Sequence, residues 1–303
     1  MTIVTHFKLL GFPLHPYAIV PVFCLALLCY IVTITGNILI ISIVWLNRKL
    51  QRPMYFFLCN LAIIDICFIT TTVPNWLKDI LSKEKSLSVF ACLAQSYFFF
   101  LSGTAEFLIL AVMSVDRYLA ICFPLQYATV INRVFCIKVT IGVWLGSFSS
   151  IFFTSYLIMT LKFCFSEINH FICDVGPLLK NACINTAHIE KCVLVSSSVV
   201  IISFLVTFIS YINIIIAVAK ISSRRKERII STCSSHAVAV SLVYGSCMFM
   251  YSQPKNHNSF RYKYVSIMNT VIVPMLNPFI YTLRNQNVKE IVNTKYLKHL
   301  KMQ

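Results

Sequence analysis

The sequence predicts an all-α membrane protein, a single domain (residues 1–303) that folds as a seven-transmembrane helix bundle. Hydrophobic residues make up 58% of the chain and charged residues only 12%, whereas soluble domains average about 25% charged residues. The charged residues leave long gaps, and each gap holds at least the roughly 20 apolar residues that a helix needs to cross a bilayer. The predicted spans are 17–46, 54–77, 90–118, 136–159, 193–219, 231–252 and 264–283.

Each span follows from one gap between charged residues. Two gaps are interrupted by a single acid, Asp65 in the second span and Glu106 in the third. The other five are free of charge, and they run Lys8–Arg48, Lys138–Lys162, Lys191–Lys220, Arg228–Lys255 and Lys263–Arg284. No soluble core needs seven such runs, so a membrane protein is predicted.

The distribution of lysine and arginine predicts the orientation of the bundle. With the N-terminus extracellular and the C-terminus cytoplasmic, sixteen of the 26 basic residues fall on the cytoplasmic side and ten outside. The net charge of +16 is therefore explained by membrane topology, and nucleic acid is not a predicted partner. Residues 286–298 predict a short amphipathic helix on the inner leaflet, because apolar residues alternate there with lysines.

The thirteen cysteines divide by compartment. Most lie in the spans or near the cytoplasmic face, where free thiols are expected. Five lie on the oxidising side or close to it, so at least one of them stays unpaired, and the sequence alone leaves the pairing open. These five are Cys92, Cys164, Cys173, Cys183 and Cys192.

The stretch Met113–Tyr127 carries Asp116-Arg117-Tyr118 at the end of a long apolar segment, where charges indicate a membrane boundary or a function. It resembles the MAYDRYVAICxPLxY signature of tetrapod-type (class II) olfactory receptors, a family of rhodopsin-like G-protein-coupled receptors. Further stretches are similar to the family motifs LHxPMYFFL, STCxSH and PMLNPxIYSLRN, in the same order along the chain. They are Leu50–Leu58, Ser231–His236 and Pro274–Asn285.

This resemblance implies an odorant receptor of the plasma membrane that serves sensory transduction. The expected ligand is a small, neutral, mostly apolar odorant, bound in the outer half of the bundle. The expected partner is a heterotrimeric G protein of the stimulatory olfactory type, which raises cyclic AMP. A receptor of the same fold used outside olfaction is the first alternative. A transporter is disfavoured because no inverted repeat is visible. An enzyme is disfavoured because no nucleophile–base set occurs, and no cofactor is predicted.

The resemblance also implies a ligand pocket between the third, fifth, sixth and seventh helices. Two groups of these residues follow the i, i+3, i+4, i+7 spacing of one helix face. For any single residue, ordinary helix packing is an equally good explanation. The family-matched positions are Phe99, Phe100, Gly103, Thr104, Phe107, Val195, Val199, Tyr244, Cys247, Met248, Tyr251, Asn269 and Thr270.

Activation residues are implied in the same way. Asp116 would hold Arg117 at rest, and the freed arginine would face the G protein. A surface ion pair, a satisfied core histidine and a simple proline kink are the structural alternatives. The positions are Asp116, Arg117, Tyr118, Tyr211, His236, Asn277, Pro278 and Tyr281.

The two intramembrane acids, Asp65 and Glu106, match a polar site between helices that holds a cation such as sodium or shares a proton. A structural hydrogen-bond cluster is the alternative. Cys233 and His236 have zinc-like spacing, but no second ligand pair follows, so no metal site is predicted there. The family pattern implies disulfides Cys92–Cys173 and Cys164–Cys183, which leave Cys192 unpaired.

Overall fold

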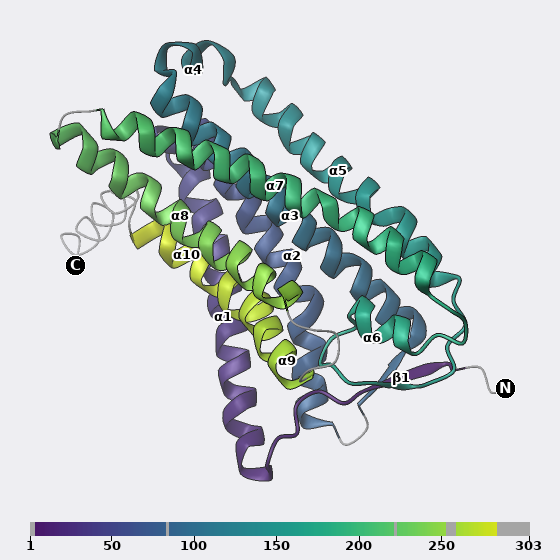
Figure 1. Ribbon diagram of the computed structural model, residues 1–303. Coiled ribbons are helices and arrows are strands. Elements are labelled where there is room, and N and C mark those ends of the chain that lie inside the picture. Colours follow the sequence, from purple (N-terminus) through teal and green to yellow (C-terminus); the bar gives the residue numbers. More distant parts are fainter. Residues whose placement is uncertain (1–3, 83–84, 221–222, 253–258, 284–303) are drawn as a thin grey trace.

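The computed structural model describes residues 4–82, 85–220, 223–252 and 259–283 (Figure 1). In these ranges, six helical segments are long and apolar enough to cross a membrane, and the apolar part of a further helix, Cys233–Phe249, is shorter. The sixth of these long segments, Arg261–Tyr281, combines parts of two helices and a π-helical turn. The bundle consists of α1 (Pro16–Leu46), α2 (Pro53–Leu81), α3 (Val89–Cys122), α5 (Arg133–Met159), α7 (Ala187–Ala219), α8 (Ser223–Ser252), α9 (Ser259–Ile267), η2 (Met268–Ile272) and α10 (Val273–Leu283).

Local sequence signals explain where several helices begin. Proline occupies the first helical position of α1 and α2, where its missing N–H costs no hydrogen bond. Ser88 caps α3 by accepting a hydrogen bond from Ala91 N, and Asn132 caps α5 by accepting one from Phe135 N. Because polar end turns continue the helices beyond their apolar part, α7 begins at Ala187 and α8 at Ser223, ahead of the predicted spans at 193 and 231.

A small sheet accompanies the helix bundle. Within the described ranges, β1 (His6–Leu9) lies between β2 (Ser86–Ser88), its antiparallel neighbour, and β3 (Glu167–Ile168), its parallel neighbour. Side chains alternate along β1, so Phe7 and Leu9 are buried while His6 and Lys8 are exposed. The sheet lies at one end of the bundle (Figure 1), which we call the sheet end.

Short helices cover both ends of the bundle. One turn, η1 (Arg48–Leu50), precedes α2, and α4 (Pro124–Val130) follows α3 at the end opposite the sheet, which we call the Arg117 end. At the sheet end, α6 (Val175–Lys180) lies in the connection between α5 and α7 (Figure 1). The tail helix predicted at 286–298 lies outside the described residues.

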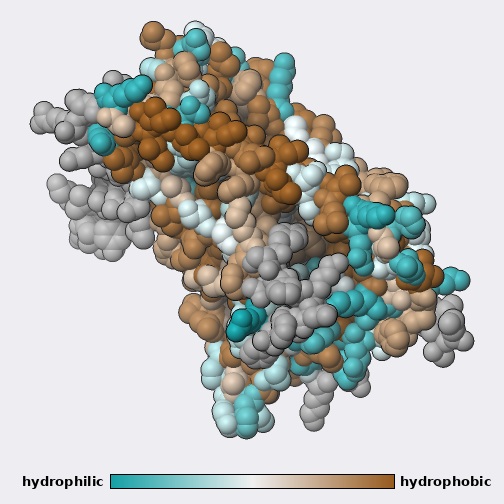
Figure 2. Space-filling view, in the orientation of Figure 1, coloured by the Kyte–Doolittle hydropathy of each residue, from teal (hydrophilic) through white to brown (hydrophobic). Residues whose placement is uncertain are grey.

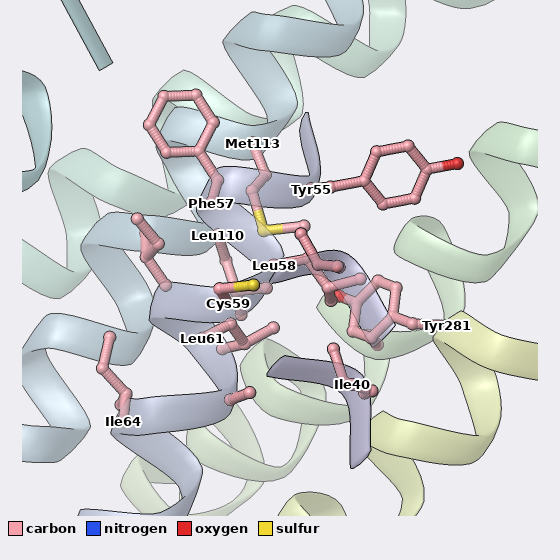
Figure 3. Close-up of a cluster of buried hydrophobic side chains, with 14 of the residues drawn as sticks. Ile40, Tyr55, Phe57, Leu58, Cys59, Leu61, Ile64, Leu110, Met113 and Tyr281 are labelled. Carbon is pink, nitrogen blue, oxygen red and sulfur yellow. The ribbon is translucent and has the colours of Figure 1, made fainter. Parts of the chain in front are cut away.

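The largest apolar core lies toward the Arg117 end, where α2 and α3 pack against α1, α8 and α10. Figure 3 shows Leu58, Leu61, Leu110 and Met113 in this core, with Tyr281 of α10 beside them. A second cluster at the sheet end packs Phe7 against the connection between α5 and α7. Many large hydrophobic side chains are exposed on the bundle helices. On the face shown in Figure 2, hydrophobic side chains extend along the length of the bundle, and many hydrophilic ones lie toward the sheet end.

Candidate functional site

A cavity of about 160 Å³ opens between the helices, toward the sheet end. The third span contributes a stripe of aromatic and small side chains to its wall, because residues three and four apart share one helix face. The ring of Phe68 on α2 packs against that of Phe99 in a tilted arrangement, with 4.8 Å between the ring centroids. The α3 residues in the wall are Phe99, Phe100, Gly103, Thr104, Glu106 and Phe107.

Hydroxyl groups from α5 and α7 line the cavity beside the aromatic rings. Thr154 on α5 and Ser196 on α7 are joined by a hydrogen bond of 2.8 Å. The remaining contributions of these two helices are Ile151, Ser155 and Ile158 from α5, and Val193, Ser197 and Val200 from α7. The wall is therefore apolar with a polar strip.

The last span adds an amide to the cavity through its π-helical turn. Asn269 lies in η2, which widens the helix just before Pro274, and π-helical turns of this kind are frequent at functional sites. Its Oδ1 accepts a hydrogen bond from Ser246 of α8. Ser266, Val273, Val243 and Cys247 complete this side of the wall.

Tyr244 lies buried next to the cavity and joins three helices. Its hydroxyl is 3.0 Å from Ser203 Oγ and 3.5 Å from Thr207 Oγ1, both on α7, and it donates to the carbonyl oxygen of Phe107 on α3 at 3.3 Å. A movement of α8 relative to α3 or α7 therefore has to break these hydrogen bonds.

The two intramembrane acids lie in one buried cluster. Asn277 Nδ2 donates to both carboxylate oxygens of Asp65, at 3.1 and 3.0 Å. Glu106 is 5% exposed and lines the cavity, and its Oε1 has no hydrogen-bond partner within the described part of the chain. Glu106 therefore belongs to the cavity wall and interacts electrostatically with Asp65.

Close contact between α1 and α10 follows from a glycine. A Cβ added at Gly36 would lie 3.0 Å from Pro278 Cβ and 3.1 Å from Pro278 Cγ. Only a residue without a side chain lets α10 approach α1 this closely, so Gly36 allows the contact between α1 and Pro278, the residue that follows Asn277.

At the Arg117 end, Asp116 accepts a hydrogen bond of 2.9 Å from the hydroxyl of Tyr127 in α4. Among the described residues no salt bridge joins Asp116 to Arg117, and the guanidinium group contacts the sulfur of Met54. The Tyr127 hydroxyl lies outside the spans, and burial followed by the charge of Asp116 raises its pKa above its ordinary value.

Tyr211 and His236 are hydrogen-bonded to each other. The Tyr211 hydroxyl lies 2.7 Å from His236 Nδ1, and the two rings stack with an interplanar angle of 10°. Tyr118 is partly buried against the neighbouring apolar cluster of α7 and α8. These contacts tie α7 to α8 near Arg117.

Two disulfides fasten the sheet end. Cys92 at the start of α3 is bonded to Cys173, and Cys164 is bonded to Cys183, both as expected, while Cys192 is free. Gln95 supports the first bridge by accepting a hydrogen bond from Cys173 N at 3.1 Å.

Comparisons with known proteins agree with this architecture. The family model of the 7 transmembrane receptor (rhodopsin family) matches residues 36–281. The chain is 44% identical to Olfactory receptor 6X1 of Homo sapiens over 95% of this chain and 94% of that protein. It is 41% identical to Olfactory receptor 6S1 of Homo sapiens over 97% and 90%, and 42% identical to Olfactory receptor 287 of Rattus norvegicus over 94% and 93%. The chain belongs to the olfactory-receptor family. It is a multi-pass receptor of the plasma membrane and not an enzyme.

Of the residues expected in the receptor's ligand pocket, seven line the cavity. Five of them belong to the α3 stripe, and the other two lie on α8 and η2. They are Phe99, Phe100, Gly103, Thr104, Phe107, Cys247 and Asn269.

Five expected pocket residues lie elsewhere. Val195 is 72% exposed, and the receptor's α7 turns its neighbours Ser196 and Val200 to the cavity in place of Val195 and Val199. Met248 is also exposed, whereas Thr270 and Tyr244 are buried beside the cavity without lining it. The side chain of Tyr251 is outside the described part of the receptor.

The α5 wall is the part of the site that the sequence did not reveal. Its only sequence signal is the adjacent pair Thr154 and Ser155 inside an apolar segment, which many membrane helices carry for intrahelical hydrogen bonds. The sequence also did not reveal Tyr127, whose hydroxyl donates a hydrogen bond to Asp116. Tyr211 and His236, expected among the activation residues, are hydrogen-bonded to each other.

Proposed function

We propose that the protein is an odorant receptor that binds a small, neutral, mostly apolar volatile in the cavity between α3, α5, α7 and α8. The observation that carries this proposal is the composition of the wall. No lysine or arginine is among the described lining residues, and burying a carboxylate ligand without a counter-charge costs several kcal/mol. The phenylalanine rings instead favour apolar contact, at about 25 cal/mol per Å² removed from water.

The sheet end would face the outside of the cell and the Arg117 end the cytoplasm. Both disulfides lie at the sheet end, which supports this orientation because disulfides persist on the oxidising side of a membrane. The excess of basic residues in the connections at the Arg117 end supports it independently.

Ligand binding would favour an active bundle through its higher affinity for that state. Opening would separate α8 from α7 near Tyr211 and His236 and expose Arg117 to a heterotrimeric G protein. The family supports coupling in general, and we propose the stimulatory olfactory type, which raises cyclic AMP.

Asp65 and Glu106 would act as a polar switch below the ligand, holding a sodium ion or sharing a proton. Asn277, Pro278 and Tyr281 would allow α10 to pivot. The carboxylate oxygens of Asp65 and the Oε1 of Glu106, which has no hydrogen-bond partner among the described residues, are ligands of the kind that suits a sodium ion. A direct test is sodium titration of thermal stability, with Glu106→Gln expected to reduce the effect of sodium.

A panel of neutral, acidic and basic volatiles tests the proposed function in cells that report cyclic AMP. We expect alcohols, aldehydes, ketones or esters as the best agonists, and Thr104→Val or Asn269→Leu should shift the ranking without silencing the receptor. Carboxylates or protonated amines as the best agonists at pH 7 would contradict the proposal. A receptor of the same fold used outside olfaction would give the same response, and its tissue of expression would distinguish it.

A further inference from the structure

The polar strip on the α5–α7 side of the cavity is a connected chain of hydrogen bonds. Thr154 Oγ1 lies 2.8 Å from Ser196 Oγ and 3.5 Å from the backbone oxygen of Cys192, to which it donates. Thr154 is 7% exposed, and both hydroxyl-bearing residues line the cavity. A ligand in the cavity can therefore contact this chain of hydrogen bonds directly, at Ser196.

Counting protons gives the direction of this chain. A serine or threonine hydroxyl donates one hydrogen bond and accepts up to two. Both contacts of Thr154 form together only when Thr154 donates to Cys192 O and Ser196 donates to Thr154. In that arrangement the protons of Thr154 and Ser196 are both used inside the protein, and Ser196 presents lone pairs to the cavity.

The neighbouring serine does not change this result. Ser197 also lines the cavity, and its hydroxyl donates to the carbonyl oxygen of Val193 at 2.8 Å. The three hydroxyls of Thr154, Ser196 and Ser197 thus commit their protons to the protein. These three hydroxyls can accept further hydrogen bonds and have no proton left to donate, while the strip also contains the hydroxyl of Ser155.

We infer that Thr154 and Ser196 form the subsite for the single oxygen of the ligand, and that this subsite prefers a hydroxyl group to a carbonyl or ether oxygen. The inference rests on the proposed odorant binding in the cavity, and it narrows the ligand class from oxygenated volatiles to alcohols. The hydroxyl of an alcohol donates to Ser196 and extends the chain to Cys192. A carbonyl or ether oxygen only accepts, so the chain has to reverse and the contact of Thr154 with Cys192 is lost.

The expected preference is modest, because the contact that a carbonyl ligand would break is long. One net neutral hydrogen bond corresponds to a difference of about 2- to 10-fold in affinity. The hydrocarbon part of the alcohol would pack against the phenylalanine rings of α3 and against Phe68, which carry no hydrogen-bonding group.

The test compares three probes of equal chain length, a primary alcohol, its aldehyde and its methyl ether, in cyclic-AMP reporter cells at equal surface expression. We expect the alcohol to be about 2- to 10-fold more potent than the other two on the wild type. Thr154→Val leaves the proton of Ser196 free to donate, so the aldehyde should gain potency and the preference for the alcohol should disappear. Ser196→Ala should lower the potency of the alcohol to that of the aldehyde and leave the aldehyde unchanged within about two-fold. Thr154→Ser retains the hydroxyl and should retain the preference.

Ser149→Ala is the matched control, because this exposed serine of α5 donates to Gly146 O away from the cavity. It should leave all three potencies unchanged. Equal potency of the three probes on the wild type would overturn the inference while leaving odorant binding intact. An equal loss for all three probes in Thr154→Val and Ser196→Ala would also overturn it, since that result means packing and not recognition. A wild type that responds to no neutral volatile would refute the proposed function itself, and the subsite with it.

Discussion

Asn277 donates hydrogen bonds to both carboxylate oxygens of Asp65, at 3.1 and 3.0 Å, and so links α10 to α2 one residue before Pro278. Both side chains are almost completely buried. Because the contact lies directly before the proline inside α10, the pair attaches the last helix to the bundle next to Pro278. Its loss should be felt both in stability and in activation.

Asn277→Ala should destabilise the receptor by about 1–3 kcal/mol, because it leaves a buried carboxyl group without its donor. Thermal denaturation of the purified receptor measures this effect. The exchange double variant Asp65→Asn/Asn277→Asp restores a donor–acceptor pair and should recover part of the loss. If the exchange variant is no more stable than Asn277→Ala, the contact between the two residues does not explain the effect.

Gly36→Ala should destabilise the receptor by about 1–3 kcal/mol, because the added methyl group meets Pro278 at 3.0 Å and α1 has to move away from α10. Gly142→Ala is the matched control, since a Cβ at that position in α5 meets nothing within 4 Å. The control should be neutral or slightly stabilising, as alanine is the better helix former. Equal melting temperatures for the two variants would rule out the close contact.

Arg117→Ala should abolish odorant-driven cyclic AMP and leave the receptor at the cell surface, because Arg117 lies at the end of α3 remote from the cavity. Lys138→Ala removes an exposed basic residue of α5 and should signal normally. Reporter assays normalised to surface labelling measure both variants. Unchanged signalling by Arg117→Ala at equal surface level would exclude the proposed role of this residue.

The sheet end should be less stable in acid because of His170. The ring stacks on Phe171, and Tyr262 packs edge-on against it. Nδ1 accepts a hydrogen bond from Ile172 N, while Nε2 has no partner in the described ranges. Burial, opposed by Asp174 and assisted by Lys263, lowers the pKa of His170 below its ordinary 6.5.

An unfolded chain therefore binds a proton at this histidine before the folded receptor does. The contribution of neutral His170 to the free energy of unfolding is fully present above pH 6.5. It falls as the pH drops below that value, by at most about 1.4 kcal/mol per pH unit. His170→Asn keeps an acceptor for Ile172 N but does not titrate, so its melting temperature should change less between pH 7.5 and 5.5 than that of the wild type. His6→Asn, at an exposed histidine, is the control and should behave like the wild type. A wild-type slope that persists in His170→Asn would assign the acid sensitivity to another group.

The sequence by itself determined the membrane architecture. Bilayer thickness sets a minimum apolar length, which is a local property of the chain, so gaps between charged residues locate the spans without any knowledge of packing. The stripe Phe100, Gly103, Thr104 and Phe107 could be assigned to one face of α3 because helical spacing is also local. The disulfide pairs followed from the family resemblance, since five cysteines near one compartment leave several pairings open.

Only the tertiary structure decided which faces meet. The fifth span, α7, is apolar on nearly every side, so its sequence does not indicate how the helix is rotated, and packing against α3 and α5 turns Ser196 and not Val195 to the cavity. The same holds for Thr154 on α5 and for Tyr127, which reaches Asp116 from a short helix that no charge gap predicts. Strand β1 is four residues long and depends on partners about 80 and 159 positions away along the chain, because backbone hydrogen bonds in a sheet are satisfied only by other strands.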